Sequence, residues 1–530
     1  MFIALAPLTL CTGYYNAKFQ TGFHFSGDIC PDPSLSSDPE RNEYTLNFLV
    51  DNALDLSVLN GRYKNDETGA PAYSPKILIK IVLLAYSRGI IHSRKIARAC
   101  VENMVFRALS ADTKPHFTTI ANFISSMDQA TIHLFRDVLM YCDQMGLIGK
   151  EMFAIDGCKI SSNASKERSG TTADYKKKAA KMEHAIEHIM SKHRKTDLSG
   201  IEQDIKKRDD DYAETLRKKV KEIRTWMDNN DDKPGKTGKP IKSNMTDNDS
   251  AKMKTSKGVI QGHNGIAAAD SKYQIVVHAE AFGQGNEHDL LQPMLEGIKE
   301  TFSAIDDPEI LTRIRLTADS GSHTEKNMEL LAKMGIDGYV ADNQFRKRDP
   351  RFSDSGRYKE QHRKERAKIE GRSGLFKVED FVFPDDFSHC ICPAGKRLYA
   401  NGCNITQGNF KTHKFRGPIS ACGPCKLRTQ CLRNPENPNG TRQVSYFLGR
   451  TEKGKNTFSE KMKNKIDSVI GKFFYGQRLG TIEPVFANIC STLGLNRFTL
   501  RGKAKVNSQW LLYCMVHNLK KIHRFAPEFA

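Results

Sequence analysis

The chain has 530 residues, more than one hydrophobic core usually supports, and its length fits roughly two to four domains. Hydrophobic residues make up 39% of the sequence and charged residues 27%, a balance that excludes a wholly disordered chain. The 81 lysines and arginines outnumber the 62 acidic residues and give a net charge of +19, so we expect a polyanionic partner such as nucleic acid; a purely solubilising role is the alternative.

Two further features of the sequence bear on membrane association and on the redox compartment of the protein. No apolar run reaches about 18 residues, so we expect no membrane-spanning helix and no membrane partner. The 13 cysteines are an odd number, and six of them lie between Cys390 and Cys431. A secreted disulfide scaffold would distribute its cysteines in pairs along the chain. The distribution therefore predicts a reducing, cytoplasmic compartment and one local metal cluster.

The N-terminal part changes from irregular to helical. Residues 1–45 are turn-rich and form an expected N-terminal extension, whereas apolar residues at helical spacing begin at Leu46. Further helices are predicted after Pro75, Ser93 and His116, so we predict an all-helical domain over 46–150. Two short helices around Arg88-Gly89 indicate a helix-turn-helix that could enter a DNA groove. A helical domain that binds no DNA is equally compatible with this pattern.

Buried strands alternate with helices over residues 151–345. The predicted elements, in chain order, are strands at 153–157, 264–270 and 274–282, a helix through 290–298, a strand at 314–319, a helix at 323–334 and a strand at 338–342. This order predicts a mixed α/β sheet with helices packed against it. Between the first two strands, the charged segment 174–228 predicts an antiparallel helical hairpin with a coiled-coil-like seam and a solvated outer face.

Two basic segments follow. Residues 346–372 hold eleven lysines and arginines against five acidic residues, which suits either a helix along a phosphate backbone or a surface arm. From Asn496 to Arg524 the chain has seven basic residues and no acidic one, beside apolar residues that predict a folded segment. A folded segment with only positive charges favours contact with the phosphates of a nucleic acid.

Two acids lie at the ends of predicted strands, Asp156 and Asp319. Two carboxylates about 4 Å apart repel each other by about 4 kcal/mol at an effective dielectric constant near 20. A divalent cation offsets this cost, and Mg²⁺ prefers a few carboxylate oxygens. The alternative for each residue alone is a turn or helix cap. The order of elements favours the metal site, because it resembles an RNase H-like sheet.

The cysteine cluster predicts a second metal site by its spacing. Cys422, Cys425 and Cys431 offer three thiolates, and Cys392 is the expected fourth ligand. Cys390 and Cys403 are alternative ligands. A closed Zn²⁺ site would hold this small insertion together, an iron–sulfur cluster suits the same ligands, and unligated buried cysteines are the third possibility.

Short segments over nearly the whole chain carry a family resemblance. They are Tyr73-Ser-Pro75, Ser93-Arg-Lys95-Ile-Ala, Ile155-Asp156-Gly157, Lys254-Thr-Ser-Lys257-Gly258, Gly262-His-Asn264, Ala318-Asp319-Ser-Gly321, Cys392-Pro-Ala-Gly395-Lys396, Glu483-Pro-Val-Phe486, Arg497-Phe-Thr-Leu-Arg501-Gly502 and His517-Asn518-Leu519. In this order the chain resembles a DDE-type insertion-sequence transposase, from the group with a helical N-terminal domain and a Cys-rich insertion before the final acid.

The resemblance implies the catalytic and metal-binding triad Asp156, Asp319 and Glu483. It also implies two Mg²⁺ or Mn²⁺ ions, cleavage and strand transfer of double-stranded DNA at the terminal repeats of the element and at its target, a homodimer, and a place at the nucleoid. The expected DNA contacts are Tyr475, Arg478, Arg497, Arg501, Lys503 and Lys505. The expected division is an N-terminal extension 1–45, a DNA-binding domain 46–150, a catalytic core 151–345, a basic and Cys-rich insertion 346–450, and a C-terminal core part 451–530.

Two positions depart from the family pattern. Cys490 stands where the family usually has a lysine, so Lys503 or Lys505 takes over that phosphate contact or the contact is lost. His263 stands where Tyr is usual. The Glu483-Pro484 pair predicts that a helix begins there, because proline suits a first helical turn. A catalytically inactive DNA-binding descendant and an RNase H-like nuclease remain the alternative functions.

Overall fold

The computed structural model describes most of the chain but leaves several segments out. The described residues are 19–20, 42–62, 72–196, 203–235, 238–256, 258–352, 374–402, 405–407, 410–451 and 456–526. Residues 1–18 and 21–41 of the expected extension, residues 353–372 of the basic segment, and Cys403 therefore lie outside them. The chain divides into two units, Met1–Thr317 with Gln477–Ala530, and Ala318–Gly476.

The N-terminal part of the first unit is helical. Its helices are α1 (Asn42–Asn52), α2 (Pro75–Ser87), α3 (Ser93–Glu102), α4 (Met104–Leu109), α5 (Phe117–Ser125) and α6 (Asp128–Gln144). Pro75 occupies the first turn of α2, where its missing N–H costs no helical hydrogen bond. Ten of the thirteen residues of α2 are buried, so this helix is the centre of the group.

A six-stranded sheet forms the middle of the chain. Its strands are β3 (Met152–Ser161), β8 (Ala251–Thr255), β9 (Gly258–Asp270), β10 (Val276–Phe282), β11 (Arg315–Ala318) and β12 (Asp337–Val340). The strand order is β10-β9-β3-β11-β12, with β8 also paired to β9. The antiparallel pairing of β3 with β9 places Asp156 opposite Ala267.

The C-terminal helix α19 (Lys503–Phe525) closes the core of the first unit. It contacts α6 and β10, and fourteen of its residues are buried. Trp510 lies flat against Gly265 of β9, where a Cβ atom would come within 3.1 Å of the indole. The indole nitrogen donates a hydrogen bond to the carbonyl of Ile266 at 3.0 Å. A side chain at 265 would therefore require the indole to shift by a few tenths of an ångström, and glycine avoids this crowding.

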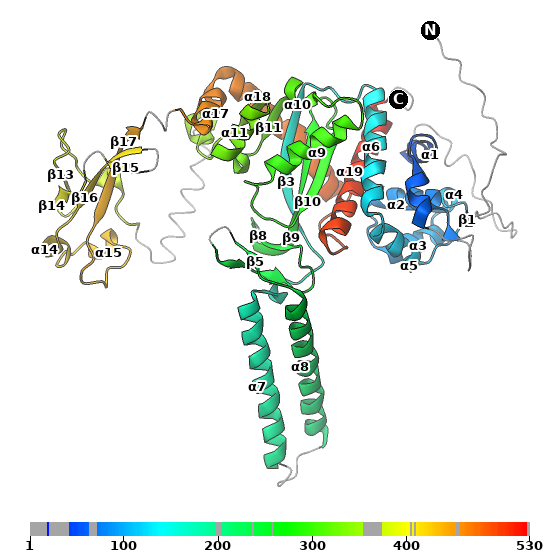
Figure 1. Cartoon of the computed structure of the whole chain (residues 1–530), viewed down its shortest axis with the longest axis horizontal. Coiled ribbons are helices and arrows are strands. Elements are labelled where there is room, and N and C mark those ends of the chain that lie inside the picture. The colour runs from blue at the N-terminus through cyan, green and yellow to red at the C-terminus, as the bar shows by residue number, and fades with distance from the viewer. Residues whose placement is uncertain are drawn as a thin grey trace. The chain divides into compact units, whose positions relative to one another are not determined.

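The predicted helical hairpin is present. Helices α7 (Thr172–Thr196) and α8 (Gln203–Asn229) run side by side (Figure 1). A small core at the base holds Tyr175, Ala179, Val220 and Ile223. Most of the remaining described side chains on both helices are exposed or half-buried, as expected for a solvated outer face. Strand β8 was not among the predicted strands.

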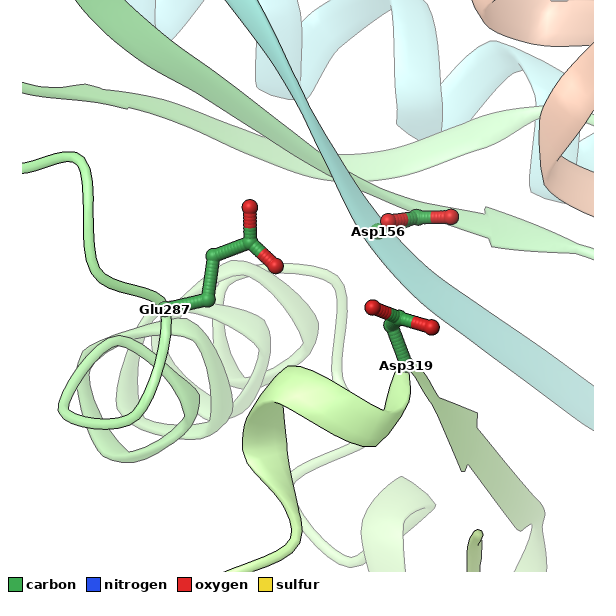
Figure 2. A group of neighbouring side chains, drawn as sticks. All are labelled: Asp156, Glu287 and Asp319. Atoms are coloured by element: carbon green, nitrogen blue, oxygen red, sulfur yellow. The ribbon is translucent and has the colours of Figure 1, made fainter. Parts of the chain in front are cut away.

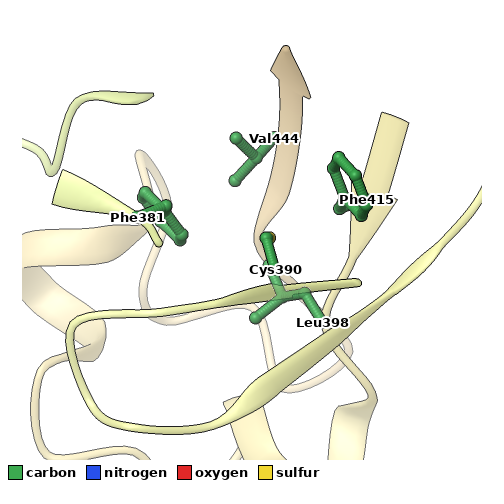
Figure 3. Close-up of a cluster of buried hydrophobic side chains, with 5 residues drawn as sticks. All are labelled: Phe381, Cys390, Leu398, Phe415 and Val444. Carbon is green, nitrogen blue, oxygen red and sulfur yellow. The ribbon is translucent and has the colours of Figure 1, made fainter. Parts of the chain in front are cut away.

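The second unit contains a small sheet in addition to the helices α11 (Glu325–Lys333), α12 (Phe345–Arg348) and α17 (Phe458–Asp467). Its strands are β13 (His389–Ile391), β14 (Arg397–Ala400), β15 (Ile405–Gln407), β16 (Phe410–Arg416) and β17 (Gln443–Arg450), in the order β13-β14-β16-β15 with β17 also on β16. Figure 3 shows the core on one face of this sheet, made of Phe381, Cys390, Leu398, Phe415 and Val444.

Helix α18 (Val469–Phe486) corrects one prediction. Glu483 and Pro484 do not begin a helix; they lie near the end of α18, which continues into a π-helical turn at Ala487–Thr492. A proline inside a helix deprives the carbonyl four residues earlier of its hydrogen bond. That carbonyl belongs to Gly480, and the side chain of Gln274 donates to it at 3.1 Å. The tertiary contact thus makes the interior proline tolerable.

The fold class is mixed α/β, as predicted, with helices flanking the central sheet. Helix α9 (Leu291–Ser303) packs on β10 and β9 and buries the predicted face of Leu291, Met294, Leu295 and Ile298. Within the described part of the chain, none of the helices combines the length and apolar composition that crossing a bilayer requires.

Candidate active site

Three carboxylates form the principal candidate site. Asp156, Glu287 and Asp319 each offer one oxygen, and these oxygens lie within 4.8 Å of one another. Figure 2 shows Asp156 on strand β3, Asp319 directly after strand β11, and Glu287 on the loop that leads into a helix. All three residues are half-buried. Such a group of hard oxygen ligands, partly open to solvent, suits Mg²⁺ or Mn²⁺.

Asp156 is held by two neighbours in its own unit. Its Oδ1 accepts a hydrogen bond from the backbone N–H of Gly157 at 2.8 Å. Its Oδ2 accepts from the Arg478 guanidinium on α18, and the side chains are only 15% and 7% exposed, respectively. Because both charges are largely removed from water, each depends on the other for stabilisation. Arg478 thus contacts a carboxylate in this structure.

A glycine and an asparagine connect Asp156 to Glu287. The side chain of Asn264 on β9 donates to Glu287 Oε1 at 3.3 Å. A Cβ atom on Gly157 would lie 2.7 Å from Asn264 Oδ1, so only glycine leaves room for this amide. The motifs Ile155-Asp156-Gly157 and Gly262-His-Asn264 therefore meet in space: one supplies the acid, and the other positions a second acid.

Glu287 was missed by the sequence reasoning. Glu287 lies between β10 and α9, on an irregular loop with Gly283 and Gly285. The signal in the sequence that could have identified Glu287 is its position, shortly after the predicted strand 274–282 of the same sheet. Sequence spacing alone does not place it opposite Asp156, because the loop conformation decides where the side chain lies.

Asp319 also acts as a helix cap, the structural role that the sequence offered as the alternative to metal binding. It caps the short 3-10 turn Ser320–Ser322, and its Oδ2 accepts from the N–H of Gly321 at 3.4 Å. A carboxylate has two oxygens and several lone pairs, so a cap and a metal contact do not exclude each other.

Glu483, the predicted third acid, is exposed on α18 and is not a member of the three-carboxylate group. It lies five positions after Arg478, and at about 100° per residue the two side chains leave the helix in different directions. The structure therefore brings Asp156 and Asp319 together with Glu287, and it places Glu483 on another face of the helix that carries Arg478.

The other predicted DNA contacts occupy varied surroundings. Tyr475 packs edge-on against Phe345, with ring centroids 5.2 Å apart. Arg497 and Arg501 are exposed, and their Nε atoms donate to the carbonyls of Ser162 and Asn163, respectively, at 3.0 and 2.9 Å. Lys503 pairs with Glu280 at 2.9 Å, whereas Lys505 is exposed at the start of α19.

Cys490 lies against Cys158 of the Asp156 strand. Their sulfur atoms are 3.8 Å apart. This contact, followed by burial, raises the pKa of the Cys158 thiol well above its usual value. Position 490, where the resembling family usually has a lysine, is thus occupied by a thiol that contacts a second thiol.

The four predicted cysteine ligands gather at one place. Cys392, Cys422, Cys425 and Cys431 line a common cavity of about 30 Å³ in the second unit. The Cys392 sulfur accepts a hydrogen bond from the N–H of Lys396 at 3.4 Å. Burial raises the pKa of the Cys431 thiol and so disfavours its thiolate form. A bound cation would stabilise the thiolate and lower this pKa again. Thiolates are the donors that a thiophilic metal prefers, but among the described residues these sulfur atoms do not all come within 4.8 Å of one another as the carboxylate oxygens do.

The alternative ligand Cys390 is buried in the small core of Figure 3 instead, where burial raises its pKa to about 11.

Comparisons with known proteins identify two parts of the chain. Residues 391–523 match the family model described as "Transposase DDE domain", and residues 36–126 match the one described as "Transposase domain (DUF772)". The first range contains the cysteine cavity and Glu483, and the second contains α1 to α5. No curated protein and no solved structure matches the chain.

Proposed function

We propose a function from one premise: the two family matches indicate an insertion-sequence transposase of the DDE type. A DDE transposase domain implies the RNase H-like fold that the sequence predicted, and its substrate is DNA. We propose that this chain cuts DNA at the ends of its element and joins the freed 3′ ends to a target. The convergence of Asp156 and Asp319 supports this proposal most strongly, because these two acids were predicted from strands far apart in the sequence.

The chain's own residues would work as follows. Asp156 and Asp319 would hold the divalent cations, with Glu483 as the predicted third acid and Glu287 as a further carboxylate beside them. Two bound cations would supply an activated water and stabilise the leaving 3′ oxygen. Asn264 keeps Glu287 directed at the group, and Arg478 balances the charge of Asp156. The basic residues around the start of α19 would contact phosphates and set the register of the DNA.

The cysteine cavity has a structural role in this proposal. Zn²⁺ held by Cys392, Cys422, Cys425 and Cys431 would stabilise a small sheet whose core, in the described part of the chain, contains five buried hydrophobic residues. An iron–sulfur cluster is the alternative for the same thiols. We further propose action as a homodimer at the nucleoid, because handling two element ends requires two active sites.

The test uses the full-length protein and a plasmid carrying the inverted repeats that flank its gene. Wild type should nick the plasmid in Mg²⁺ or Mn²⁺, and Asp156→Asn and Asp319→Asn should each abolish nicking while DNA binding remains. Asp289→Asn, which changes an acid outside the carboxylate group, is the matched control.

The outcomes separate the alternatives. A wild type that binds DNA but never cuts would favour the inactive descendant, for which Cys490 is the supporting observation. Cleavage without any joined product from pre-cut ends would favour a plain nuclease.

A further inference from the structure

The sheet of β13 to β17 has two faces of different chemistry. One face packs on the core of Leu398, Phe415 and Val444 (Figure 3). Because side chains alternate along a strand, the neighbours of these residues point to the other face. That outer face carries Arg397 and Tyr399 on β14, Lys414 and Arg416 on β16, and Phe447 on β17.

The strand register places two exposed rings on either side of β16. Tyr399 pairs with Arg416, and Phe447 pairs with Thr412. Arg416 and Thr412 are four positions apart on β16, roughly 13 Å at about 3.3 Å per residue. Lys414 lies midway between them along the strand. The two rings therefore lie at the ends of a diagonal line, with two cationic side chains along it.

Both rings are open to solvent, although aromatic side chains are among those that gain most from burial. Tyr399 is 57% exposed and Phe447 is 54% exposed. The Arg397 guanidinium lies 5.8 Å from the Tyr399 ring centroid, and the Phe410 ring meets Phe447 edge-on at 5.7 Å. Arg397 therefore covers one face of the Tyr399 ring, and a planar partner would stack on the exposed remainder of the two rings.

The charge of this region selects the partner. Residues 387–450 contain ten lysines and arginines and one acidic residue, Glu436. A surface of this sign attracts phosphates and disfavours a basic or purely apolar protein partner. Exposed aromatic rings among cations are the arrangement that binds unpaired nucleotides, whose bases stack on the rings while their phosphates meet the charges. Duplex DNA keeps its base faces stacked and cannot use the rings in this way.

We infer that the outer face of this sheet binds an unpaired DNA strand, with bases stacked on Tyr399 and Phe447 and phosphates on Arg397, Lys414 and Arg416. The inference rests on the proposed function in that the substrate is DNA. It deepens that function by assigning the Cys-rich insertion to the unpaired nucleotides of an opened DNA end.

The experiment compares single-stranded and duplex probes on the full-length, metal-containing protein. Fluorescence anisotropy would follow a labelled oligothymidylate of about 20 nucleotides and a duplex of equal length. We expect the double variant Tyr399→Ala/Phe447→Ala to weaken single-strand binding about tenfold or more and to leave duplex binding within about twofold. Tyr399→Trp/Phe447→Trp should retain single-strand binding, because it keeps the stacking surfaces.

Two further variants sharpen the test. Tyr212→Ala removes a ring that is 55% exposed on α8, and it should leave single-strand affinity unchanged. Arg397→Ala/Arg416→Ala should lower the slope of log affinity against log salt by about 1.4, since each lost phosphate contact removes about 0.7.

The inference is overturned if the ring variant binds the single strand as Tyr212→Ala does, even when the wild type cuts DNA. It is also overturned if single-strand and duplex affinities fall equally, because the face would then follow a duplex backbone. A wild type that binds the single strand through these rings but never cuts DNA would overturn the proposed function alone.

Discussion

The Arg478 guanidinium donates a hydrogen bond to Asp156, and it joins helix α18 to strand β3 at the candidate active site. Both residues were predicted to function, one as a phosphate contact and the other as a metal ligand. Their contact means that the charge of the central acid is balanced by a helix that lies far along the chain. The position of α18 and the state of Asp156 are therefore coupled.

Removing this arginine should destabilise the protein. Arg478→Ala leaves the Asp156 charge largely buried without its partner, which typically costs about 3 to 5 kcal/mol. Urea unfolding followed by tryptophan fluorescence would measure the loss, and added Mg²⁺ should restore part of it. Arg98→Ala is the matched control, because its pair with Glu102 is 74% and 57% exposed and should contribute less than about 1 kcal/mol. Equal losses in the two variants would contradict the coupling.

The identity of the third acid can be decided by isosteric changes. We expect Glu483→Gln to reduce Mg²⁺-dependent nicking by at least about a hundredfold if it supplies a cation ligand, as the family resemblance implies. Glu287→Gln should reduce it by about tenfold, because this carboxylate lies beside the other two and is oriented by Asn264. The measurement is the initial rate of plasmid nicking at several Mg²⁺ concentrations. A large effect of Glu287→Gln with none of Glu483→Gln would replace Glu483 by Glu287 in the triad.

Two buried histidines should make the first unit sensitive to acid. Burial lowers the pKa of His278 and of His517 from 6.5 to about 4, aided by Arg136 near the first and by Lys520 and Lys521 near the second. Between these values the unfolded chain binds protons that the folded chain does not. Stability is therefore complete above about pH 6.5 and falls as the pH drops toward about 4, by up to about 3 kcal/mol for each histidine.

Urea midpoints at several pH values would measure this loss. His517→Gln should flatten the slope between pH 6.5 and 4, whereas His92→Gln, at an exposed position, should not. Parallel slopes in wild type and His517→Gln would show that His517 is not responsible.

The four cysteines that line the cavity lead us to expect one bound metal centre per chain. Purified protein should contain one Zn²⁺ or one iron–sulfur cluster per chain, and Cys425→Ser should lose it together with the protease resistance of the small sheet. Cys100→Ser is the control, because Cys100 is buried among the N-terminal helices. Metal analysis and limited proteolysis are the measurements. Full metal content in Cys425→Ser would exclude Cys425 as a ligand.

Local patterns in the sequence were sufficient for much of the architecture. The order of strands and helices, the helical hairpin and the gathering of four cysteines all follow from periodicity and spacing, which depend on neighbouring residues. The glycine beside Asp156 was quoted as a motif, and the structure supplies its reason, since any side chain there would collide with Asn264.

Contacts between distant segments were decided only by the tertiary structure. Glu287 joins Asp156 through a loop conformation, Cys490 meets Cys158 through helix packing, and Gln274 satisfies the Gly480 carbonyl that Pro484 leaves free. A local reading placed Pro484 at a helix start, because proline is ordinarily costly inside a helix. The hydrogen bond that offsets this cost comes from more than two hundred residues earlier in the chain. Periodicity determines which face of an element is buried, whereas packing determines which distant side chain meets it.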